Sequence, residues 1–594
     1  MRSVLAFVLL VCSAHAATYY VDCAAGSDAA LGASPAAAWR TVAKVSASTF
    51  APGDAILLRR GAECVGTLSP KGSGEDGRPI RLGAYGEGRL PQVRAAGAEA
   101  AVKLANQQFW EIENLDASGG NPYGVYIAAD GARPVRHIVL RDLLVHDVGG
   151  TVKTKASGLV VVSATHGAGL EDVTIDGVTA CRTSQWAGIY VSGSETRARG
   201  VTIRNSVVHE VAGDGIIIFQ AEDARIEKSA AWHTGLQERE TIGTPNAIWT
   251  WTCRRCTVEN NEGFWVDSPG VDGGVYDIDW GNDDNVVEHN YAHDAQGYCA
   301  AIFGAGGRPT TNSAIRYNVC VNNGRSPKLA HRQGDIYTST WDGGSLDGIA
   351  IERNTVVWNP PIDAPAMQMQ GTEFSGTRAN TVAGNIIYSA VASMVNAAAP
   401  VKFENNTYWH PGREDAGWCY GGRGCAGFSE WREIAPRDRF TDPGFDFLLR
   451  PLRLEPGAPP APAVLGYLPA AIPRGRGWLL LMFGGKAEGD ARSQLVFLQA
   501  ALAQYSDAGL DAAIVVDGDP DLPYDWNFGA VRRMEAAGVD RALGIHTAPV
   551  LLLVSPKGEI VRRWDGFAAP SNLGLTLKHY LGSAPGDPPL PFDR

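Results

Sequence analysis

The chain has 594 residues, more than a single hydrophobic core organises, so we expect two to four domains. Its 70 glycines favour many turns over long helices. The formal net charge of −12 excludes a protein that binds nucleic acid by general electrostatic attraction. It also repels acidic polymers unless a metal or a local basic patch intervenes.

Residues 1–16 have the layout of a secretory signal peptide. Arg2 precedes the apolar run "VLAFVLLV", and an Ala-His-Ala cleavage site ends at Ala16. A lipoprotein signal that uses Cys12 is the alternative, but Val11 stands where a small residue is expected. No later stretch has the run of about eighteen apolar residues that a membrane span needs. We therefore predict a secreted or periplasmic protein without a membrane span.

Nine of the ten cysteines lie beyond this segment, and in an exported protein some should form disulfides. The short Gly-rich loop "CYGGRGC" at 419–425 suits a local bridge, and Cys23 with Cys64 is the second predicted pair. Because the count is odd, at least one thiol remains. Cys253 and Cys256 form a "CRRC" motif that lacks a second ligand pair, so we predict a structural bridge or buried thiols over a redox or zinc site.

A short pattern recurs along the middle of the chain: alternating β-branched residues precede an asparagine, and another apolar run follows it. Apart from one double interval, the copies lie 20 to 36 residues apart. The copies are "TIRNSVV" from 202, "TVENNEGF" from 257, "VVEHNYAH" from 286, "AIRYNVCV" from 314, "AIERNTVV" from 350, "TVAGNIIY" from 381 and "VKFENNTYW" from 401.

A second set of short strands lies between these copies, for example "GIIIFQ" from 215, "AIWTWT" from 247, "VYDIDW" from 275 and "DIYTST" from 335. No repeat contains an amphipathic helix of ten or more residues. A unit this small cannot bury its apolar side alone, whereas stacked units pair each strand with its copy in the next coil. The pattern predicts a right-handed parallel β-helix.

The recurrent asparagine is interpreted as architecture. Asparagine tolerates the left-handed backbone conformation and can hydrogen-bond to its copy one coil away. The positions concerned are Asn205, Asn290, Asn318, Asn354, Asn385 and Asn406.

With these repeats, the opening "YYVDCAAGSD…PGDAILLRRG" and the closing "FTDPGFDFLLRPLRLEPGAPP" resemble exported bacterial β-helix proteins of the pectate-lyase-like superfamily, over residues 17–466. The resemblance implies the right-handed parallel β-helix fold. It does not fix the substrate, because one fold serves many functions.

The chain changes character after a Pro-rich and Ala-rich passage, with a linker predicted at 467–475. Residues 476–583 alternate apolar strands with helices, including a helix near 527–537 and a hairpin that turns at Lys557 and Gly558. This order resembles a thioredoxin-like domain, with "HTAPVLLLV" matching the cis-proline segment of that family at Pro549. Residues 584–594 form a tail.

The thioredoxin-like segment departs from the family at its redox centre. "GGKAEGDARSQ" stands where the family carries its Cys-x-x-Cys pair, and no cysteine follows Cys425. Dithiol chemistry needs thiolates, so we predict a redox-inactive accessory module that could dock to a protein partner.

The stretch "GVDGGVYDIDWGNDDN" at 270–285 holds five aspartates and no Lys or Arg. If Ile278 points into the core, the alternation of a strand turns Asp277 and Asp279 outward together, about 6.5 to 7 Å apart. Asp283 and Asp284 are interpreted as turn residues. The candidate catalytic pair is therefore Asp277 and Asp279.

Neighbouring coils add aromatic and basic side chains. The same alternation exposes Trp249 and Trp251, on which sugar rings could stack, and sends Tyr337 outward. The loop "RSPKLAHRQG" before Tyr337 carries the candidate catalytic bases Lys328, His331 and Arg332. Asp214 and Asp294 could also reach this groove, although a turn explains them equally well. The residues His289, His293 and Glu288 are interpreted as structural.

Two mechanisms fit these residues. In a glycoside hydrolase, Asp277 and Asp279 serve as acid and base without a cofactor, and their short separation indicates inversion. In a polysaccharide lyase, Asp272 joins them to hold Ca²⁺, with Asp283 or Asp284 as further ligands, and the ion neutralises a uronate. A base of the neighbouring loop then drives β-elimination.

The tryptophans and the acidic charge favour a neutral polysaccharide and hydrolysis. The aspartate surplus and the superfamily resemblance favour the calcium lyase. A third possibility is a non-catalytic glycan-binding rod.

Overall fold

The computed structural model describes residues 16–131, 133–237, 242–327, 333–369, 378–398, 400–411, 417–445, 448–449, 464–470, 472–473, 475, 477–484, 488–515, 531–534, 538–546 and 548–582. The predicted signal peptide, apart from Ala16, and the predicted tail lie outside these residues. No helix of the described residues has both the length and the apolar character needed to cross a membrane.

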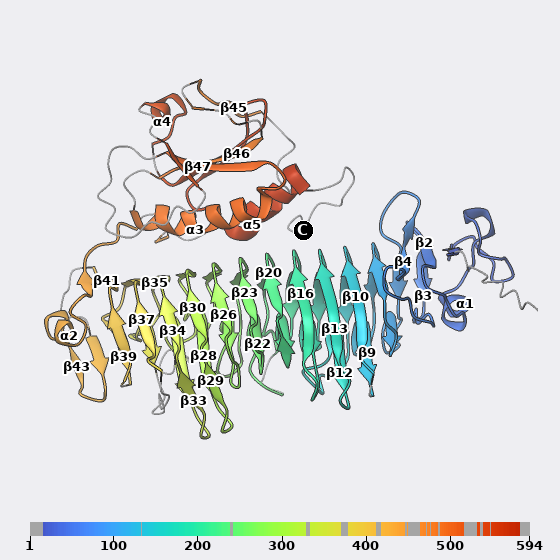
Figure 1. Cartoon of the computed structure of the whole chain (residues 1–594), viewed down its shortest axis with the longest axis horizontal. Helices are drawn as coiled ribbons and strands as arrows, with labels where there is room; N and C mark the ends of the chain where they lie inside the picture. Colours follow the sequence, from blue (N-terminus) through green and yellow to red (C-terminus); the bar gives the residue numbers. More distant parts are fainter. Residues whose placement is uncertain are drawn as a thin grey trace, which may run out of the picture.

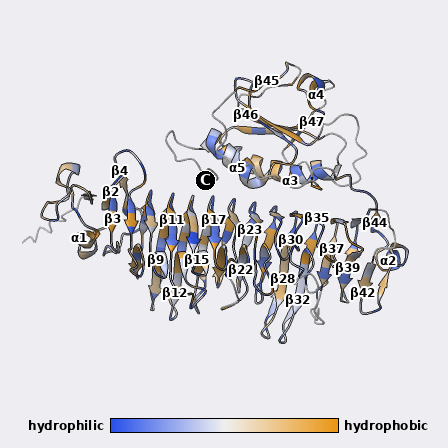
Figure 2. Cartoon of the chain, turned by 180° about the vertical axis from the view of Figure 1, so that it is seen from behind, coloured by the Kyte–Doolittle hydropathy of each residue, from blue (hydrophilic) through white to orange (hydrophobic). Residues whose placement is uncertain are grey.

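The described residues between 18 and 440 wind into a parallel β-helix, as predicted (Figure 1), and form three long sheets of fifteen, fourteen and thirteen strands. Each regular coil contributes one strand to sheet III, then one to sheet I, then one to sheet II, and strands pair with their equivalents in adjacent coils. Along the coils, hydrophobic and hydrophilic residues alternate (Figure 2), as the pleat of a half-buried strand requires.

Sheet I has fifteen strands. They are β1 (Thr18–Val21), β2 (Ala55–Arg59), β4 (Ile80–Tyr85), β7 (Trp110–Glu113), β10 (Val135–Arg141), β13 (Leu170–Asp176), β16 (Ala198–Arg204), β19 (Ala221–Glu222), β20 (Arg225–Glu227), β23 (Thr257–Glu259), β26 (Val286–Glu288), β30 (Ala314–Arg316), β34 (Ala350–Glu352), β37 (Thr381–Ala383) and β40 (Lys402–Glu404).

Sheet II has fourteen strands. They are β3 (Glu63–Val65), β5 (Gln92–Arg94), β8 (Asp116–Ser118), β11 (Leu144–Val148), β14 (Thr179–Thr183), β17 (Val207–Val211), β21 (Ala230–Trp232), β24 (Glu262–Phe264), β27 (Tyr291–His293), β31 (Val319–Val321), β35 (Thr355–Trp358), β38 (Ile386–Ser389), β41 (Thr407–Trp409) and β44 (Arg439–Phe440).

Sheet III has thirteen strands. They are β6 (Val102–Ala105), β9 (Tyr123–Asp130), β12 (Gly158–Thr165), β15 (Ala187–Ser192), β18 (Ile216–Phe219), β22 (Ile248–Trp251), β25 (Tyr276–Ile278), β28 (Ala300–Gly304), β32 (Ile336–Thr340), β36 (Met367–Met369), β39 (Ser393–Ala397), β42 (Gly417–Tyr420) and β43 (Cys425–Ala426). A separate pair, β29 (Pro309–Thr311) and β33 (Ser345–Asp347), extends two coils.

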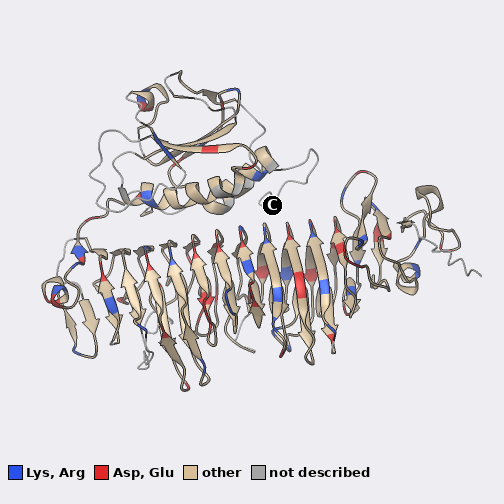
Figure 3. Ribbon diagram, viewed as in Figure 1, with Lys and Arg blue, Asp and Glu red and all other residues tan. Residues whose placement is uncertain are grey.

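The outer face of sheet I is charged. Figure 3 shows basic and acidic residues side by side on the strands around β10, β13 and β16. Arg136 pairs with Glu171 at 2.7 Å, and Arg199 pairs with Glu222 at 3.3 Å, each across adjacent coils. Such exposed pairs contribute little stability, so sheet I is interpreted as a solvated face.

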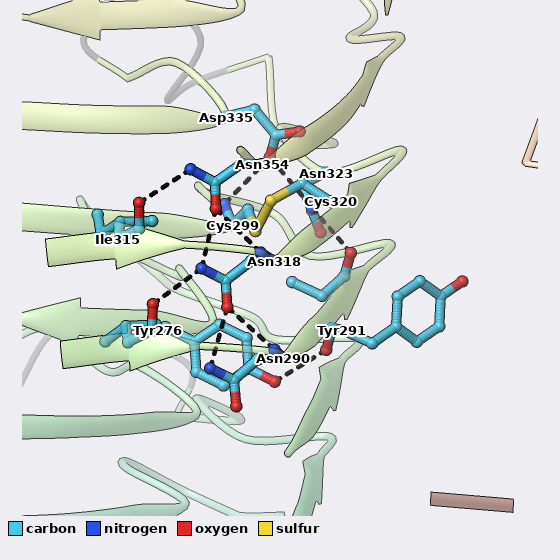
Figure 4. Close-up of a disulfide and its surroundings, with 12 residues drawn as sticks. Tyr276, Asn290, Tyr291, Cys299, Ile315, Asn318, Cys320, Asn323, Asp335 and Asn354 are labelled. Carbon is cyan, nitrogen blue, oxygen red and sulfur yellow. Dashed lines mark hydrogen bonds between the residues drawn. A yellow bond between two sulfur atoms is a disulfide. The ribbon is translucent and has the colours of Figure 1, made fainter. Parts of the chain in front are cut away.

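A buried polar ladder runs along the corner between sheets I and II (Figure 4). The Oδ1 of Asn318 accepts from the backbone and side-chain nitrogens of Asn290, both at 3.0 Å. Asn318 in turn donates to Asn354 at 3.0 Å and to the carbonyl of Val287 at 2.9 Å. The ladder continues in both directions through Ser229, Asn261, Asn385, Asn406 and Asp438.

The ladder confirms the hydrogen bonds predicted between copies but corrects their conformation. The left-handed residue is the one before the ladder asparagine, for example Tyr317 (φ 56°) before Asn318. Asn205 is the exception among the predicted positions, because it has φ 50° itself and Ser206 occupies the ladder position. The asparagine side chain is therefore used as a donor and acceptor, and the sharp bend falls one residue earlier.

Both predicted disulfides, Cys23–Cys64 and Cys419–Cys425, are present. A third, Cys299–Cys320, was not predicted and joins the start of β28 to β31 across one coil (Figure 4). Cys253 and Cys256 are buried thiols, one of the two predicted alternatives.

Short helices accompany both ends of the β-helix. The 3₁₀ turn η1 (Pro35–Ala37) and α1 (Val42–Ala47) lie at the first coils, and α2 (Phe428–Ile434) lies at the last. Trp431 of α2 is buried, and its indole nitrogen donates to Asp438 at 3.1 Å.

A second unit follows, with a mixed six-stranded sheet in the order β45 (Gly466–Tyr467), β50 (Glu559–Asp565), β49 (Val550–Val554), β46 (Trp478–Phe483), β47 (Leu510–Val515) and β48 (Arg532–Met534). Its helices are α3 (Glu488–Tyr505), α4 (Val539–Ala542), α5 (Pro570–Leu577) and the π-helical η2 (Lys578–Gly582). Figure 1 shows α3 and α5 between this sheet and the β-helix.

The structure confirms some of the predictions for this unit and contradicts others. The hairpin at Lys557 and the cis bond before Pro549 are present. The helix predicted near 527–537 is wrong in its described part, because residues 532–534 form β48 and pair with β47. The linker boundary is also wrong, because Gly466 and Tyr467 already pair with β50 of this unit.

The second unit packs on sheet II through apolar side chains. Tyr291 of β27 contacts Phe497 of α3 and Phe567, with ring centroids 6.3 and 5.1 Å away. Val319, Val321, Val357 and Ile386 belong to the same buried cluster. The two units therefore share one apolar interface, and sheet III lies on another face.

We expect Asn318→Ala to lower the free energy of unfolding by about 3 kcal/mol, because it leaves several buried polar groups without partners. Asn205→Gly is the control: it keeps the left-handed backbone and loses one bond to Asp176 (2.7 Å), so about 1 kcal/mol or less is expected. Denaturant unfolding of both variants measures the difference, and equal losses would contradict the ladder's role.

Candidate active site

Sheet III aligns a row of outward side chains across successive coils. Trp249 of β22 lies beside Asp277 of β25, Asp277 beside Ala301 of β28, and Ala301 beside Tyr337 of β32. The residues that flank Asp277, Tyr276 and Ile278, belong to the core. The prediction that Ile278 points inward and Asp277 outward is confirmed.

Asp277 faces outward yet is covered, with 2% of its surface exposed. The side-chain nitrogen of Asn246 donates to its Oδ2 at 3.3 Å. Its Oδ1 is buried and has no hydrogen-bond partner among the described residues. A buried carboxylate oxygen without a partner is costly, so this group is a candidate for a functional role.

Asp279 directly follows β25 and is partly exposed. Its Oδ1 accepts the backbone N–H of Trp280 at 2.8 Å. Burial raises the pKa of Asp279 to about 7, with repulsion from Asp272 and Asp214 acting in the same direction. Near neutral pH this group can therefore both hold and release a proton.

The pKa of Asp277 is raised well above its usual value, first by burial and then by the neighbouring charges of Asp279 and Asp272. Close carboxyls of this kind share protons as a pair. The two outward aspartates therefore have the electrostatic character of an acid–base pair.

Asp214, which precedes β18, is a third carboxyl of the cluster and is fully buried. Its Oδ2 accepts the indole N–H of Trp186, and its Oδ1 accepts the backbone N–H of Asn246 at 2.9 Å. Burial raises its pKa, and the charge of Lys155 opposes the rise.

Lys155 lies in the segment between β11 and β12 and brings a positive charge to the cluster. Its Nζ lies 4.0 Å from Oδ2 of Asp214. It also lies 4.9, 4.8 and 5.9 Å from the ring centroids of Trp186, Trp249 and Trp251. Cation–π attraction and the ion pair together hold this ammonium group in place.

A hollow of about 370 Å³ adjoins the cluster. Phe219 and Trp251 stack along one wall, with ring centroids 4.4 Å apart. The indole nitrogen of Trp251 has no hydrogen-bond partner among the described residues. The lining comprises Thr154, Lys155, Ala156, Tyr190, Ile217, Phe219, Ile242 and Trp251.

The predicted aromatic contacts differ in exposure. Trp251 is partly exposed and lines the hollow, whereas Trp249 is buried beneath Lys155 and Trp186 and is not the exposed platform that alternation indicated. Tyr337 is 9% exposed and packs against Phe303 with ring centroids 5.3 Å apart. The predicted bases Lys328, His331 and Arg332 lie outside the described residues.

The other aspartates of the stretch 270–285 take different positions. Asp272 accepts from the hydroxyl of Thr244, and its charge raises the pKa of Asp277 and Asp279. Asp283 forms parallel bridges to Arg254 and Thr311 and accepts from the Thr311 hydroxyl at 2.5 Å, so its interpretation as a turn residue is wrong. Asp284 lies in a bend with φ 58°.

The predicted calcium ligands do not assemble in the described structure. Among the described residues, one group of three side chains brings ligand atoms within 4.8 Å of one another, and it consists of Cys299, Cys320 and Asp335. Two of those ligand atoms are joined in a disulfide. Asp272, Asp277 and Asp279 are not such a group, and the calcium site stays a prediction.

His293 of sheet II lies in a buried polar and aromatic cluster, and its interpretation as a structural residue stays a prediction. His293 is buried between Glu262 (3.1 Å) and Asp294 (2.9 Å), and its ring stacks on Phe264. These residues lie on another sheet from Asp277, so Asp294 does not join the site.

Sequence reasoning missed Lys155, Trp186, Asn246 and Tyr298 and underrated Asp214. All five lie in segments that lead from a sheet II strand into a sheet III strand. Most of these residues are far from Asp277 in sequence, so local alternation did not predict that they lie near it. Each one lies before a sheet III strand, and an alignment of the repeats could have used that position as a signal.

A family model described as a right handed beta helix region matches residues 100–356. Lacto-N-biosidase of Bifidobacterium longum subsp. longum is 24% identical over 415 residues, covering 51% of this chain and 26% of that protein. The chain thus spans about a quarter of the length of that curated relative.

Two solved structures are also similar. A lacto-N-biosidase from Eubacterium ramulus has 19% identity and a TM-score of 0.47, covering 60% of this chain and 67% of its own. A pectate lyase has 15% identity and a TM-score of 0.33, covering 62% of this chain and 82% of its own. With the family model, the observed sheets show a right-handed parallel β-helix, the predicted fold.

The raised pKa of Asp279 predicts that the stability of the fold decreases as pH rises. Its pKa is about 7 when folded against 3.8 in the reference state, so its contribution is present below about pH 4 and is lost as pH rises through 7. We expect Asp279→Asn to weaken the fall in melting temperature between pH 4 and 8. Asp283→Asn should keep the wild-type slope, and an unchanged slope in Asp279→Asn would contradict the raised pKa.

Proposed function

We propose that the protein is an exported glycoside hydrolase that cleaves a glycan on sheet III, with Asp277 and Asp279 as the acid–base pair. One observation carries the proposal: two outward carboxyls of one coil lie together in a covered site, where burial raises the pKa of Asp279 to about 7 and that of Asp277 well above its usual value. A carboxyl with a pKa near 7 is available as a base near neutral pH while its partner keeps a proton to donate.

The roles follow from the two pKa shifts and from exposure. Asp277, whose pKa is raised well above its usual value and whose Oδ1 has no partner among the described residues, donates its proton to the glycosidic oxygen as the bond to the anomeric carbon breaks. Asp279, the more exposed of the two and ionisable near neutral pH, accepts a proton from the water that attacks that carbon. The separation expected from the strand, about 6.5 to 7 Å, favours inversion of configuration.

A neutral glycan is the substrate class that the surroundings favour. Phe219 and Trp251 offer flat apolar rings for sugar stacking beside the cluster. The aspartate cluster disfavours a uronate carboxylate, because the Lys155 charge that could attract it is already engaged with Asp214. The curated lacto-N-biosidase, at 24% identity, supports a glycan-active enzyme and leaves the sugar of this chain open.

Export is supported by the disulfides. Cys23–Cys64, Cys299–Cys320 and Cys419–Cys425 are expected in an oxidising compartment and agree with the signal peptide predicted at 1–16. We propose a secreted or periplasmic location.

The second unit is proposed to be a thioredoxin-like accessory module without redox activity. It contains no cysteine, since none follows Cys425. Its helices α3 and α5 face sheet II, so any protein partner would approach a surface other than this interface.

The reaction class is tested by incubating the full chain with neutral and uronate polysaccharides, with and without chelator. We expect new reducing ends on neutral glycans, no unsaturated ends, and no effect of chelator. Unsaturated products lost on chelation would instead establish the calcium lyase.

Asp277→Asn and Asp279→Asn should each lower kcat by about 100-fold or more, the usual contribution of a positioned acid or base. Asp283→Asn, at a bridge to Arg254 and Thr311, is the control and should keep full activity. Folded Asp277→Asn and Asp279→Asn proteins that retain turnover would support the glycan-binding rod.

Trp251→Ala should raise KM about 10-fold with a smaller change in kcat, because it removes a stacking wall of the hollow. Trp265→Ala is the matched control, since Trp265 is also exposed but follows a sheet II strand. If the two substitutions changed KM equally, the hollow would not be part of the binding site.

A further inference from the structure

We propose that Lys155 is a positioning residue that sets which carboxyls of the sheet III cluster are ionised, acting through Asp214 and Asn246. The inference rests on the proposed function for its catalytic meaning, but the charge coupling itself can be measured without turnover. Lys155 reaches the cluster from the segment between β11 and β12, more than one coil away from Asp277.

The position of the ammonium group is fixed from several sides. Trp186 precedes β15, and Trp249 and Trp251 belong to β22, so three rings from two coils surround Nζ at 4.8 to 5.9 Å. Asp214 adds a further contact, with an Nζ–Oδ2 distance of 4.0 Å. The Lys155 side chain is a quarter exposed, and these contacts hold its charge beside the cluster.

A chain of hydrogen bonds connects Asp214 to the catalytic pair. The backbone N–H of Asn246 donates to Asp214 at 2.9 Å, and the side-chain nitrogen of the same residue donates to Asp277 at 3.3 Å. The amide orientation is fixed because Oδ1 of Asn246 accepts the N–H of Gly274 and the hydroxyl of Tyr298, both at 3.0 Å. Asn246 therefore ties the position of Asp277 to that of Asp214.

The charges that surround Lys155 are predominantly acidic. Asp214 and Asp272 raise the pKa values of Asp277 and Asp279 by repulsion, and Asp279 also raises that of Asp277. The Lys155 charge lowers the pKa of Asp214, Asp277 and Asp279. The nearby phenols Tyr190 and Tyr298 stay neutral because burial raises their pKa. Without Lys155 the cluster would hold its protons to higher pH, and the base of the pair would be lost.

Lys155 also lines the hollow, so a direct contact with sugar is the competing role. The two roles differ in what Lys155→Met changes. A sugar contact changes KM and leaves the titration of the carboxyls where it was, whereas a positioning charge moves that titration in the protein without ligand. Lys155→Arg keeps the charge and therefore separates charge from shape.

The test is an infrared titration of the protonated-carboxyl band in the full chain from pH 4 to 9, with Asp279→Asn identifying the contribution of the pair. In Lys155→Met we expect the band to persist about one pH unit higher than in the wild type, the usual effect of losing a nearby opposite charge. In Lys155→Arg the band should disappear within about half a pH unit of the wild-type value, because the charge is kept. Asp214→Asn should move it the other way, to lower pH, because a repelling carboxylate is removed.

The proposal is overturned if Lys155→Met titrates like the wild type, or if Lys155→Arg behaves like Lys155→Met. If Lys155→Met fails to fold, as judged by circular dichroism, the Asp214→Asn shift decides: a shift to lower pH supports the proposal and no shift overturns it. These outcomes do not require a substrate, so a failure of the glycan panel remains distinguishable from them.

Once a substrate is found, both limbs of the pH–rate profile of Lys155→Met should move up by about one unit. A raised KM with unmoved limbs would overturn the proposal and make Lys155 a sugar contact.

Discussion

Parallel backbone pairing between successive coils is the constraint on which the rest of the structure depends. It brings each residue beside its equivalent one coil away, so a side chain type repeated in sequence becomes a continuous row in space. Inside, this produces the ladder through Asn290, Asn318 and Asn354. Outside, on sheet III, it produces the row from Trp249 through Asp277 to Tyr337.

The same pairing explains how Asp214 and Asp277 can be buried beside the partly covered Asp272 and Asp279. Burying a charge is costly unless hydrogen bonds and opposite charge compensate, and the segments that lead into sheet III supply both. Asn246 contributes two donors, and Lys155 contributes the opposing charge. The compensation is incomplete at Asp277, whose Oδ1 remains without a partner among the described residues, and incomplete satisfaction of this kind is a feature of reactive sites.

The sequence pattern correctly predicted the features that depend on residues close together in the chain or on its repeats. The inward Ile278, the outward Asp277 and the repeat-based fold follow from periods of two and of about thirty residues, and the short loop between Cys419 and Cys425 predicted its own disulfide. Cover by distant segments could not be predicted in this way. Trp249 is buried because Lys155, 94 positions earlier in the chain, lies over it.

Other misses have the same physical origin in contacts between distant segments. Cys299–Cys320 crosses a coil whose dimensions are set by the sheets rather than by loop chemistry. Residues 532–534 become a strand because the edge of β47 is open to pairing, which overrides helical periodicity. The asparagine ladder was predicted from the residue type, but the left-handed conformation lies at the residue before each ladder asparagine.

The apolar interface on sheet II makes the acceptable side chains of one unit depend on those of the other. Tyr291, Val319 and Ile386 are core residues only because α3 and its neighbours cover them, and Phe497 is buried by the same contact. A substitution that enlarges a side chain on one side must be matched by a smaller one on the other. In related chains the outer positions of β27, β31 and β38 should therefore be apolar where a second unit is attached, and polar where the β-helix occurs alone.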